Sequence, residues 1–174
     1  MAKAEDDLAV TAVSLGFRHQ PLPSDVGDVR RLVTQTGFFS RAEIEIAEEL
    51  VGERLAKGAA ESGYEFVFAT IGEAVVGYAC YGPIACTVGS FDLYWLAVDQ
   101  GRQRQGLGRQ IVAEAERQIL AAHGRHIYVE TSGRDQYEPT RRFYSQVGYE
   151  QVAVFTDFYA PGDDKVVYRK VLRP

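Results

Sequence analysis

Apolar and polar residues follow one another along the chain in patterns that predict strands and helices in turn. Val, Ala and Leu dominate residues 8–17, which predicts an opening strand that ends at the break Pro21-Leu22-Pro23. Residues 64–69 and 74–81 are rich in apolar and aromatic side chains and are separated by the turn signal Gly72-Glu73. These two segments are expected to form a β-hairpin.

Two helices are expected between the opening strand and this hairpin. Ser24 precedes the first helix and is expected to cap it, and Gly37 is expected to end it. Apolar residues at helical spacing predict the second helix over residues 40–60. Its start carries Ser40 and Glu43, a capping-box pattern in which each side chain accepts a hydrogen bond from the backbone N–H of the other residue.

The second half of the chain continues the alternation of strands and helices. Residues 90–98 are expected to form a strand, and apolar residues at helical spacing over 107–119 predict a helix. The short apolar run 127–129 predicts a further strand, and residues 139–147 predict a further helix. A hairpin around residues 160–163 is expected to complete the fold.

This order of elements predicts an α/β fold with a mixed central sheet of six or seven strands flanked by four helices. Strands separated by helices can be parallel, whereas the hairpins must be antiparallel. A chain of 174 residues falls in the size range of one domain, and no repeat, low-complexity segment or linker interrupts it. We therefore expect a tail over residues 1–7 and a single domain over residues 8–174.

Charge and hydropathy narrow the classes of function. The formal net charge is −5 and the pI is about 5.3, so no basic field would attract nucleic acid or an anionic membrane surface. No segment reaches the roughly 18 apolar residues of a membrane span, and the acidic start of the chain does not fit a signal peptide. The protein is therefore expected in the cytoplasm, as a monomer or a homodimer, with neither nucleic acid nor membrane as a partner.

Two cysteines and three histidines leave little scope for a disulfide framework or a metal site. Cys80 and Cys86 lie in one apolar run an even number of residues apart, so a regular strand would place both on the same face. We expect both to be core thiols. Ligation of a metal would need more Cys and His partners at closer spacing, and no metal is expected.

A glycine-containing loop that opens a helix carries the most specific chemical signal. The strand end Leu96-Ala97-Val98 is followed, four residues later, by Gln103-Arg104-Gln105-Gly106-Leu107-Gly108-Arg109. The free N–H groups of a helix N-terminus favour a phosphate, and glycines let the backbone approach it. A P-loop would need Gly-Lys-Ser/Thr here, and a dinucleotide-binding fingerprint would need a third glycine. The stretch is therefore expected to bind phosphate without belonging to either class.

The loop resembles the pyrophosphate-binding motif Gln/Arg-x-x-Gly-x-Gly of the GNAT superfamily of N-acetyltransferases, with Gln103, Gly106 and Gly108 in register. Residues 140–149 resemble the superfamily's second signature, a helix with an aromatic-Tyr pair followed by three residues, a glycine and an aromatic residue. Together the two matches cover about residues 64–172, and the preceding elements fit the strand and two helices that open this fold. The resemblance implies acetyl-CoA as co-substrate and acetyl transfer to a primary amine.

The resemblance also implies how the cofactor would lie. The strand 90–98 would carry a bulge and separate from its neighbour, so that the cofactor arm could pair with the main chain of Leu96, Ala97 and Val98. A backbone N–H near Val98 would stabilise the oxyanion that forms during transfer. The loop 103–109 would hold the pyrophosphate.

Three side chains are candidates for proton transfer. A carboxylate should take a proton from the attacking ammonium, and Asp92 is the first candidate, with Glu130 second. The resemblance makes Tyr144 the acid that protonates the departing thiolate. Phe143 is expected beside the cofactor, as is Tyr137, where many members carry an asparagine that holds the cofactor arm.

The helical pattern predicts how Tyr144 is oriented. Phe143 and Val147 form an apolar pair four residues apart, which would turn the adjacent Tyr144 partly away from the core.

The residues that would bind the acceptor amine are less clearly indicated than those that would bind the cofactor. In the superfamily it lies between the loop joining the first two helices and the last hairpin, which here places Phe38, Phe39, Asp157 and Tyr159 around it. Aromatic and carboxylate groups would suit a small amine or an amino acid, and the C-terminal half resembles a bacterial subgroup associated with D-alanine or amino-acid N-acetylation. Peptide N-termini and protein lysines stay open as acceptors, as does a CoA-binding module without catalysis.

Overall fold

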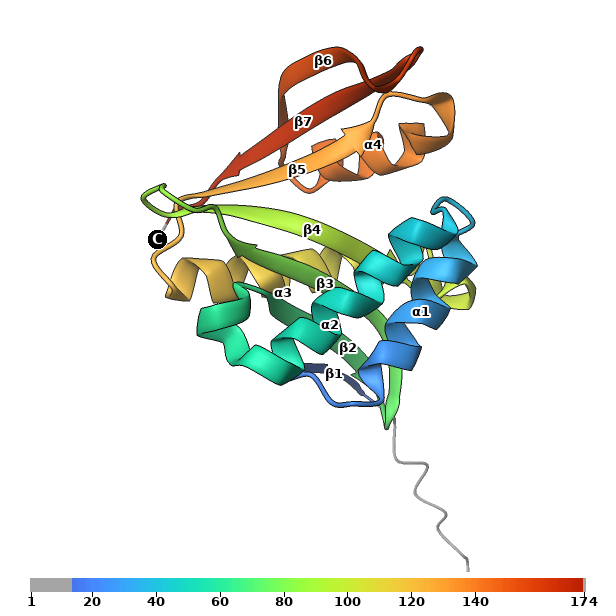
Figure 1. Ribbon diagram of the computed structural model, residues 1–174, viewed down its shortest axis with the longest axis vertical. Coiled ribbons are helices and arrows are strands. Elements are labelled where there is room, and N and C mark those ends of the chain that lie inside the picture. The colour runs from blue at the N-terminus through green and yellow to red at the C-terminus, as the bar shows by residue number, and fades with distance from the viewer. Residues whose placement is uncertain (1–13, 174) are drawn as a thin grey trace, which may run out of the picture.

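Seven strands form one mixed sheet in the part of the chain that the computed structural model describes, residues 14–173 (Figure 1). Their order across the sheet is β1-β2-β3-β4-β5-β7-β6, and β4 and β5 are parallel whereas the other neighbours are antiparallel. The strands are β1 Leu15–Arg18, β2 Glu65–Ile71, β3 Ala74–Pro83, β4 Ser90–Val98, β5 His126–Ser132, β6 Glu150–Ala160 and β7 Asp163–Val171. The predicted mixed sheet is confirmed, and the predicted tail and the first part of the opening strand lie outside the described residues.

Four α-helices cover the two faces of this sheet in the described part of the chain, as predicted. They are α1 Asp25–Thr36, α2 Arg41–Ser62, α3 Leu107–Ala121 and α4 Glu138–Gln146, with two short 3₁₀ turns, η1 Gln100–Arg102 and η2 Asp135–Tyr137. Side chains of α1 and α2 pack with residues of β2 and β3 in one core cluster, and those of α3 and α4 pack with the sheet in another. None of the helices formed by residues 14–173 is both long and apolar enough to cross a membrane.

The N-terminal caps of α1 and α2 differ in whether the residues next to them in the sequence are enough to predict them. The predicted capping box of α2 is confirmed, since Glu43 N donates to Ser40 Oγ at 3.3 Å and Ser40 N donates to Glu43 Oε2 at 2.7 Å. The predicted cap at Ser24 is wrong, because its backbone is already helical and its side chain makes no capping bond. The buried Asp25 instead accepts a hydrogen bond from Leu22 N and pairs with Arg18 at 2.7 Å.

The two cysteines do not share a face, which corrects the expectation of two core thiols. Cys80 is fully buried in β3 and packs in the cluster under α1 and α2. The strand ends at Pro83, and Cys86 is exposed in the following loop with a φ of 61°. Proline cannot continue the ladder of hydrogen bonds, so the even spacing of the cysteines no longer applies beyond it.

The arrangement of β4 relative to its neighbours creates space for a site. Cys80 pairs with Trp95 and Tyr81 pairs with Leu93, so Tyr94 is an extra residue that bulges from the ladder. On the other side, β4 pairs with β5 only over residues 90–92 and 126–128, after which the two strands diverge (Figure 1). The bulge and the separation implied by the resemblance are therefore both present.

Candidate active site

A cleft of about 950 Å³ lies where β4 and β5 separate. Its walls come from β4, β5, the N-terminal turn of α3, α4, the loop between α1 and α2, and the hairpin of β6 and β7. Elements from distant parts of the sequence thus meet where the parallel strands β4 and β5 diverge. Ligands of α/β sheets generally bind at such a place, outside the carboxyl ends of the strands.

One end of the cleft is built to hold an anion. Gly106 precedes α3 with a φ of 81°, a conformation that a side chain would strain, and no side chain caps the first turn of this helix. Arg102, Arg104 and Arg109 line the cleft around this turn, and none of them forms an ion pair with another residue of the described chain. Free N–H groups and three unpaired guanidinium groups, in a protein of net charge −5, fit a pyrophosphate.

The first turn of α3 faces the cleft through Gly108. A Cβ on this glycine would lie 3.5 Å from the ring of Phe143 and 3.7 Å from Val98 Cγ2, both of which line the cleft. These are ordinary van der Waals distances, so a methyl group fits there and a longer side chain would extend into the cleft. The residues expected to bind the cofactor all line the cleft except Gln105, whose side chain turns back and donates to Gly101 O at 3.3 Å.

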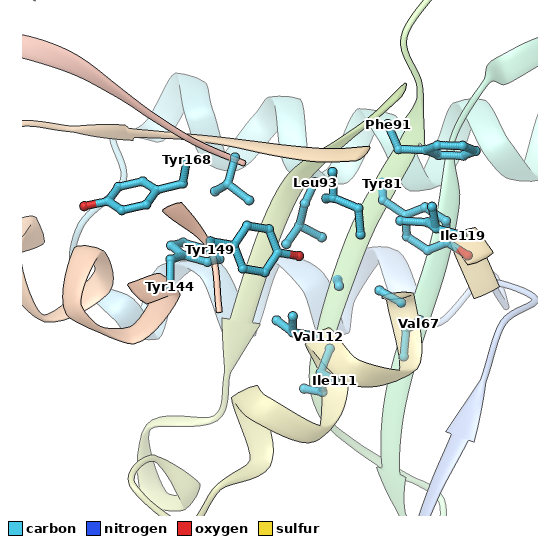
Figure 2. Close-up of a cluster of buried hydrophobic side chains, with 14 of the residues drawn as sticks. Val67, Tyr81, Phe91, Leu93, Ile111, Val112, Ile119, Tyr144, Tyr149 and Tyr168 are labelled. Atoms are coloured by element: carbon cyan, nitrogen blue, oxygen red, sulfur yellow. The ribbon is translucent and has the colours of Figure 1, made fainter. Parts of the chain in front are cut away.

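Tyr144 belongs both to the cleft wall and to the hydrophobic core. It is the buried residue of α4, with its ring centroid 5.5 Å from that of Tyr149 and 6.3 Å from that of Tyr168 (Figure 2). The expected turn away from the core is wrong, because Tyr144 is buried in the core cluster whereas Phe143 and Val147 are only partly buried against it. Burial raises the pKa of the Tyr144 phenol, so the hydroxyl keeps its proton across the physiological range.

The two candidate carboxylates lie on neighbouring strands, Asp92 on β4 and Glu130 on β5, but only Glu130 lines the cleft. Glu130 is half exposed and pairs with Lys165, whose Nζ lies 3.1 Å from its Oε1. Asp92 pairs with Tyr128 where β4 and β5 are still in register, before the strands separate, and this keeps it out of the cleft. Burial raises the pKa of Asp92, and the neighbouring charge of Glu130 raises it further.

Aromatic rings from the loop between α1 and α2, from β4 and from η2 form another part of the cleft wall. Phe38 lies 5.3 Å from the ring of Tyr137, and Phe39 lies 4.9 Å from that of Trp95, as measured between centroids. Together with Tyr159 these residues line the cleft.

Asp157 does not line the cleft, although the sequence placed it beside the acceptor. Its side chain accepts a hydrogen bond from Gly162 N at 2.7 Å, and its backbone N donates to Asp164 Oδ1 at 2.9 Å. Asp157 therefore shapes the turn between β6 and β7.

Two charged residues that the sequence did not single out for the site, Glu43 and Arg134, also line the cleft. Glu43 was assigned only to the capping box. Asp163, which belongs to the last hairpin expected beside the acceptor, lines the cleft as well. Arg134 and Asp163 are joined by an ion pair of 3.0 Å. Arg134 lies two residues after the end of β5, and a charged residue just past the carboxyl end of a central strand was the signal that could have identified it.

Comparison with known proteins agrees with this geometry. A family profile described as an acetyltransferase (GNAT) domain matches residues 62–151. A crystal structure of a protein assigned to the GNAT family, from Desulfovibrio desulfuricans, is 49% identical and superposes with a TM-score of 0.89 over 91% of this chain and 99% of its own. No curated protein matches the sequence significantly.

More distant structures share the fold. An aminoglycoside 6'-N-acetyltransferase solved with coenzyme A is 18% identical, with a TM-score of 0.72 over 92% of this chain and 98% of its own. The ribosomal-protein-S18-alanine N-acetyltransferase of Escherichia coli is 14% identical, with a TM-score of 0.71 over 92% and 96%. The profile match, the near relative and the anion-binding turn beside the separated strands together show that this chain belongs to the GNAT family and is an acyl-CoA-dependent N-acetyltransferase.

Proposed function

We propose that this enzyme acetylates a small primary amine, which attacks the acetyl thioester directly while both substrates are bound. The observation that carries the proposal is a single cleft whose lining includes both the anion-binding turn and a group of aromatic and carboxylate side chains, which we call the acceptor end: Phe38, Glu43, Glu130, Tyr137 and Tyr159. When bound, acetyl-CoA supplies the activated acetyl group. Both substrates can then be held together, and fixing two reactants in attack geometry lowers the barrier by several kcal/mol.

The residues of the cleft support distinct roles in binding. The N-terminal turn of α3, with Arg104 and Arg109, suits the pyrophosphate, and the free edge of β4 from Leu96 to Val98 suits the amide groups of the cofactor arm. Phe143, which would touch a side chain at Gly108, closes the wall between α3 and α4. A backbone N–H near Val98 would stabilise the developing oxyanion.

Glu130 and Tyr144 are the groups we propose for proton transfer. Glu130 lines the cleft and would take a proton from the ammonium, directly or through water. Tyr144 lines the same cleft with a protonated phenol and would give its proton to the thiolate as it leaves. Asp92 lies next to Glu130 and is the second candidate for the base.

The form of the acceptor end favours a small substrate. Glu43 and Glu130 supply negative charge for an ammonium group, and the rings of Phe38, Tyr137 and Tyr159 narrow the space around it. Acetylation of a peptide N-terminus or a protein lysine is the alternative function, and a module that binds CoA without turnover is a third. The presence of Tyr144 and Glu130 in the cleft favours catalysis over simple binding.

Acetyl-CoA is expected to raise the melting temperature of the protein. A ligand that binds only the folded state stabilises it by RT ln(1 + [L]/Kd), which is about 2.7 kcal/mol at a hundred times Kd. Differential scanning fluorimetry with acetyl-CoA measures this shift, and release of free thiol in the presence of a panel of primary amines measures transfer. No shift at millimolar acetyl-CoA would overturn the proposed cofactor site, and a shift without thiol release from any amine would identify a binding module.

Glu130→Gln is expected to lower kcat/KM by at least about tenfold at pH 7, since general-base assistance is typically worth 10²–10⁴-fold. The defect should become smaller as pH rises, because more of the amine is then already neutral and needs no base. Asp92→Asn is the matched comparison, since Asp92 neighbours Glu130 but lies outside the cleft, and we expect it to have a smaller effect. A pH profile in which Asp92→Asn carries the larger, pH-sensitive defect would assign the base to Asp92.

A further inference from the structure

Arg134 is a cation held in a fixed orientation at the acceptor end of the cleft. Its Nε lies 3.0 Å from Asp163 Oδ2 and donates to Ser132 Oγ at 3.3 Å. Asp163 and Ser132 are both buried and hydrogen-bonded to each other at 2.5 Å. The buried carboxylate of Asp163 therefore fixes the guanidinium group of Arg134 through its Nε.

The main chain around Arg134 is fixed as well. Arg141, from α4, donates through Nη1 to Ser132 O at 2.7 Å and to Arg134 O at 2.9 Å. The backbone N of Arg134 donates to Ser132 Oγ at 3.1 Å, and Gly133 N donates to Asp164 O at 2.7 Å. A side chain on such a braced turn loses little conformational entropy when it binds a ligand.

The outer part of the Arg134 guanidinium group is free to bind. Its two terminal nitrogens make no hydrogen bond or ion pair with another residue of 14–173, and about half of the side chain is exposed. The guanidinium carbon lies 5.7 Å from the ring centroid of Tyr137, and both residues line the cleft. An arginine anchored through Nε still offers two parallel N–H donors, which match the two oxygens of a carboxylate.

This end of the cleft presents both signs of charge. Glu43 and Glu130 line it, and burial together with their charges and that of Asp163 raises the pKa of Tyr159 to about 12. Glu43 and Arg134 both lie near Tyr137, and Glu43 and Glu130 both lie near Tyr159. The carboxylates suit the ammonium group of an acceptor, whereas Arg134 has no role in receiving an ammonium group and would repel it.

We propose that Arg134 binds a carboxylate of the acceptor, so that the acceptor is an amino acid rather than a simple amine. The inference rests on the proposed function and names the substrate class of the same site. The other arginines of the cleft, Arg102, Arg104 and Arg109, surround the N-terminal turn of α3 and are assigned to the cofactor.

The test compares alanine, as both enantiomers, with alaninamide and ethylamine, which lack the carboxylate. In Arg134→Gln, kcat/KM for the preferred alanine enantiomer should fall about 10- to 100-fold relative to kcat/KM for alaninamide, because a charge-assisted pair is lost only for the amino acid. For each amine, kcat/KM of the variant is divided by kcat/KM of the unaltered enzyme, so the different basicities of the amines do not affect the comparison. Arg134→Lys keeps the charge but not the two parallel donors, so its ratio of kcat/KM for alanine to kcat/KM for alaninamide should lie between those of the unaltered enzyme and Arg134→Gln.

Arg104→Gln serves as the matched control, since it removes a guanidinium group that lines the cleft just before the N-terminal turn of α3. It should raise KM for acetyl-CoA and leave the ratio of alanine to alaninamide unchanged. Calorimetric titration of CoA and the melting temperature of Arg134→Gln check that cofactor binding and folding persist. If Arg134→Gln does not fold, Asp163→Asn is the substitute variant. It keeps the guanidinium group of Arg134 but removes the carboxylate that orients it, and it should show the same loss of preference for alanine over alaninamide.

Three results would overturn the inference. The first is that the unaltered enzyme acetylates alaninamide and ethylamine as well as alanine. The second is that folded Arg134→Gln keeps the preference for alanine, and the third is that Arg134→Gln loses as much affinity for CoA as Arg104→Gln does. Each of these leaves the enzyme an amine acetyltransferase. Failure to acetylate any amine would instead overturn the proposed function itself.

Discussion

Gly108→Glu is expected to abolish binding of acetyl-CoA. The Cβ of a residue at this position points toward Phe143 and Val98, so a glutamate would project its carboxylate into the cleft beside the first turn of α3. A negative charge placed next to a pyrophosphate costs several kcal/mol, which corresponds to a loss of affinity on the order of 100-fold or more. Calorimetry should detect no binding at concentrations that saturate the unaltered enzyme, and the thermal shift with acetyl-CoA should disappear.

Two variants control for other effects of this substitution. Gly108→Ala adds only a methyl group at ordinary contact distance from Phe143, so it should fold and bind with a modest loss. Gln105→Glu adds the same charge three residues earlier, on a side chain that lies outside the cleft, and should weaken binding far less. Retained binding in a folded Gly108→Glu protein would show that the pyrophosphate does not lie at the start of α3.

Tyr144→Phe is expected to lower kcat with little effect on cofactor affinity. The ring packs against Tyr149 and Tyr168, and phenylalanine keeps this packing while removing the proton donor. General-acid assistance contributes about 10²–10⁴-fold, and we expect the lower half of that range because burial raises the pKa of this phenol and a thiolate is a good leaving group. The loss should occur in kcat and kcat/KM together, as for an interaction made only in the transition state.

The comparison for Tyr144 is a second buried tyrosine of the same cluster. Tyr149→Phe removes a hydroxyl from the same core, but Tyr149 does not line the cleft, so kcat should change little. Steady-state kinetics on the best amine, with calorimetric titration of CoA for each variant, makes the comparison. An unchanged kcat in Tyr144→Phe would leave this residue a packing residue and assign the acid to water.

Local patterns predicted the helices and hairpins better than the ends of the strands. The capping box at Ser40 depends only on residues three apart, and it forms as predicted. The strand expected over 127–129 is longer, because β5 pairs with β7 along its whole length from His126 to Ser132. Polar residues at its end resemble a loop in the sequence, and only pairing with a strand more than thirty residues later shows that they continue the sheet.

The anion-binding end of the cleft was the part of the site that the sequence predicted best. The turn Gly106-Leu107-Gly108 lies a few residues after β4 and owes its chemistry to the local start of a helix. The acceptor end was predicted less completely, since its residues come from several elements far apart in the chain. Asp157 was expected there and instead shapes a turn, whereas Glu43 and Arg134 were not expected and line the cleft.

The sequence alone was sufficient for the order of the elements and the loop suited to phosphate, because each depends on residues close together in the chain, and the mixed sheet followed from that order. The tertiary structure decided which charged groups share the cleft. Glu130 lies beyond the point where β4 and β5 separate and Asp92 lies before it, and this difference is a property of strand pairing. Arg134 is oriented by Asp163, which follows it by almost thirty residues and reaches it only because β5 and β7 are neighbours in the sheet.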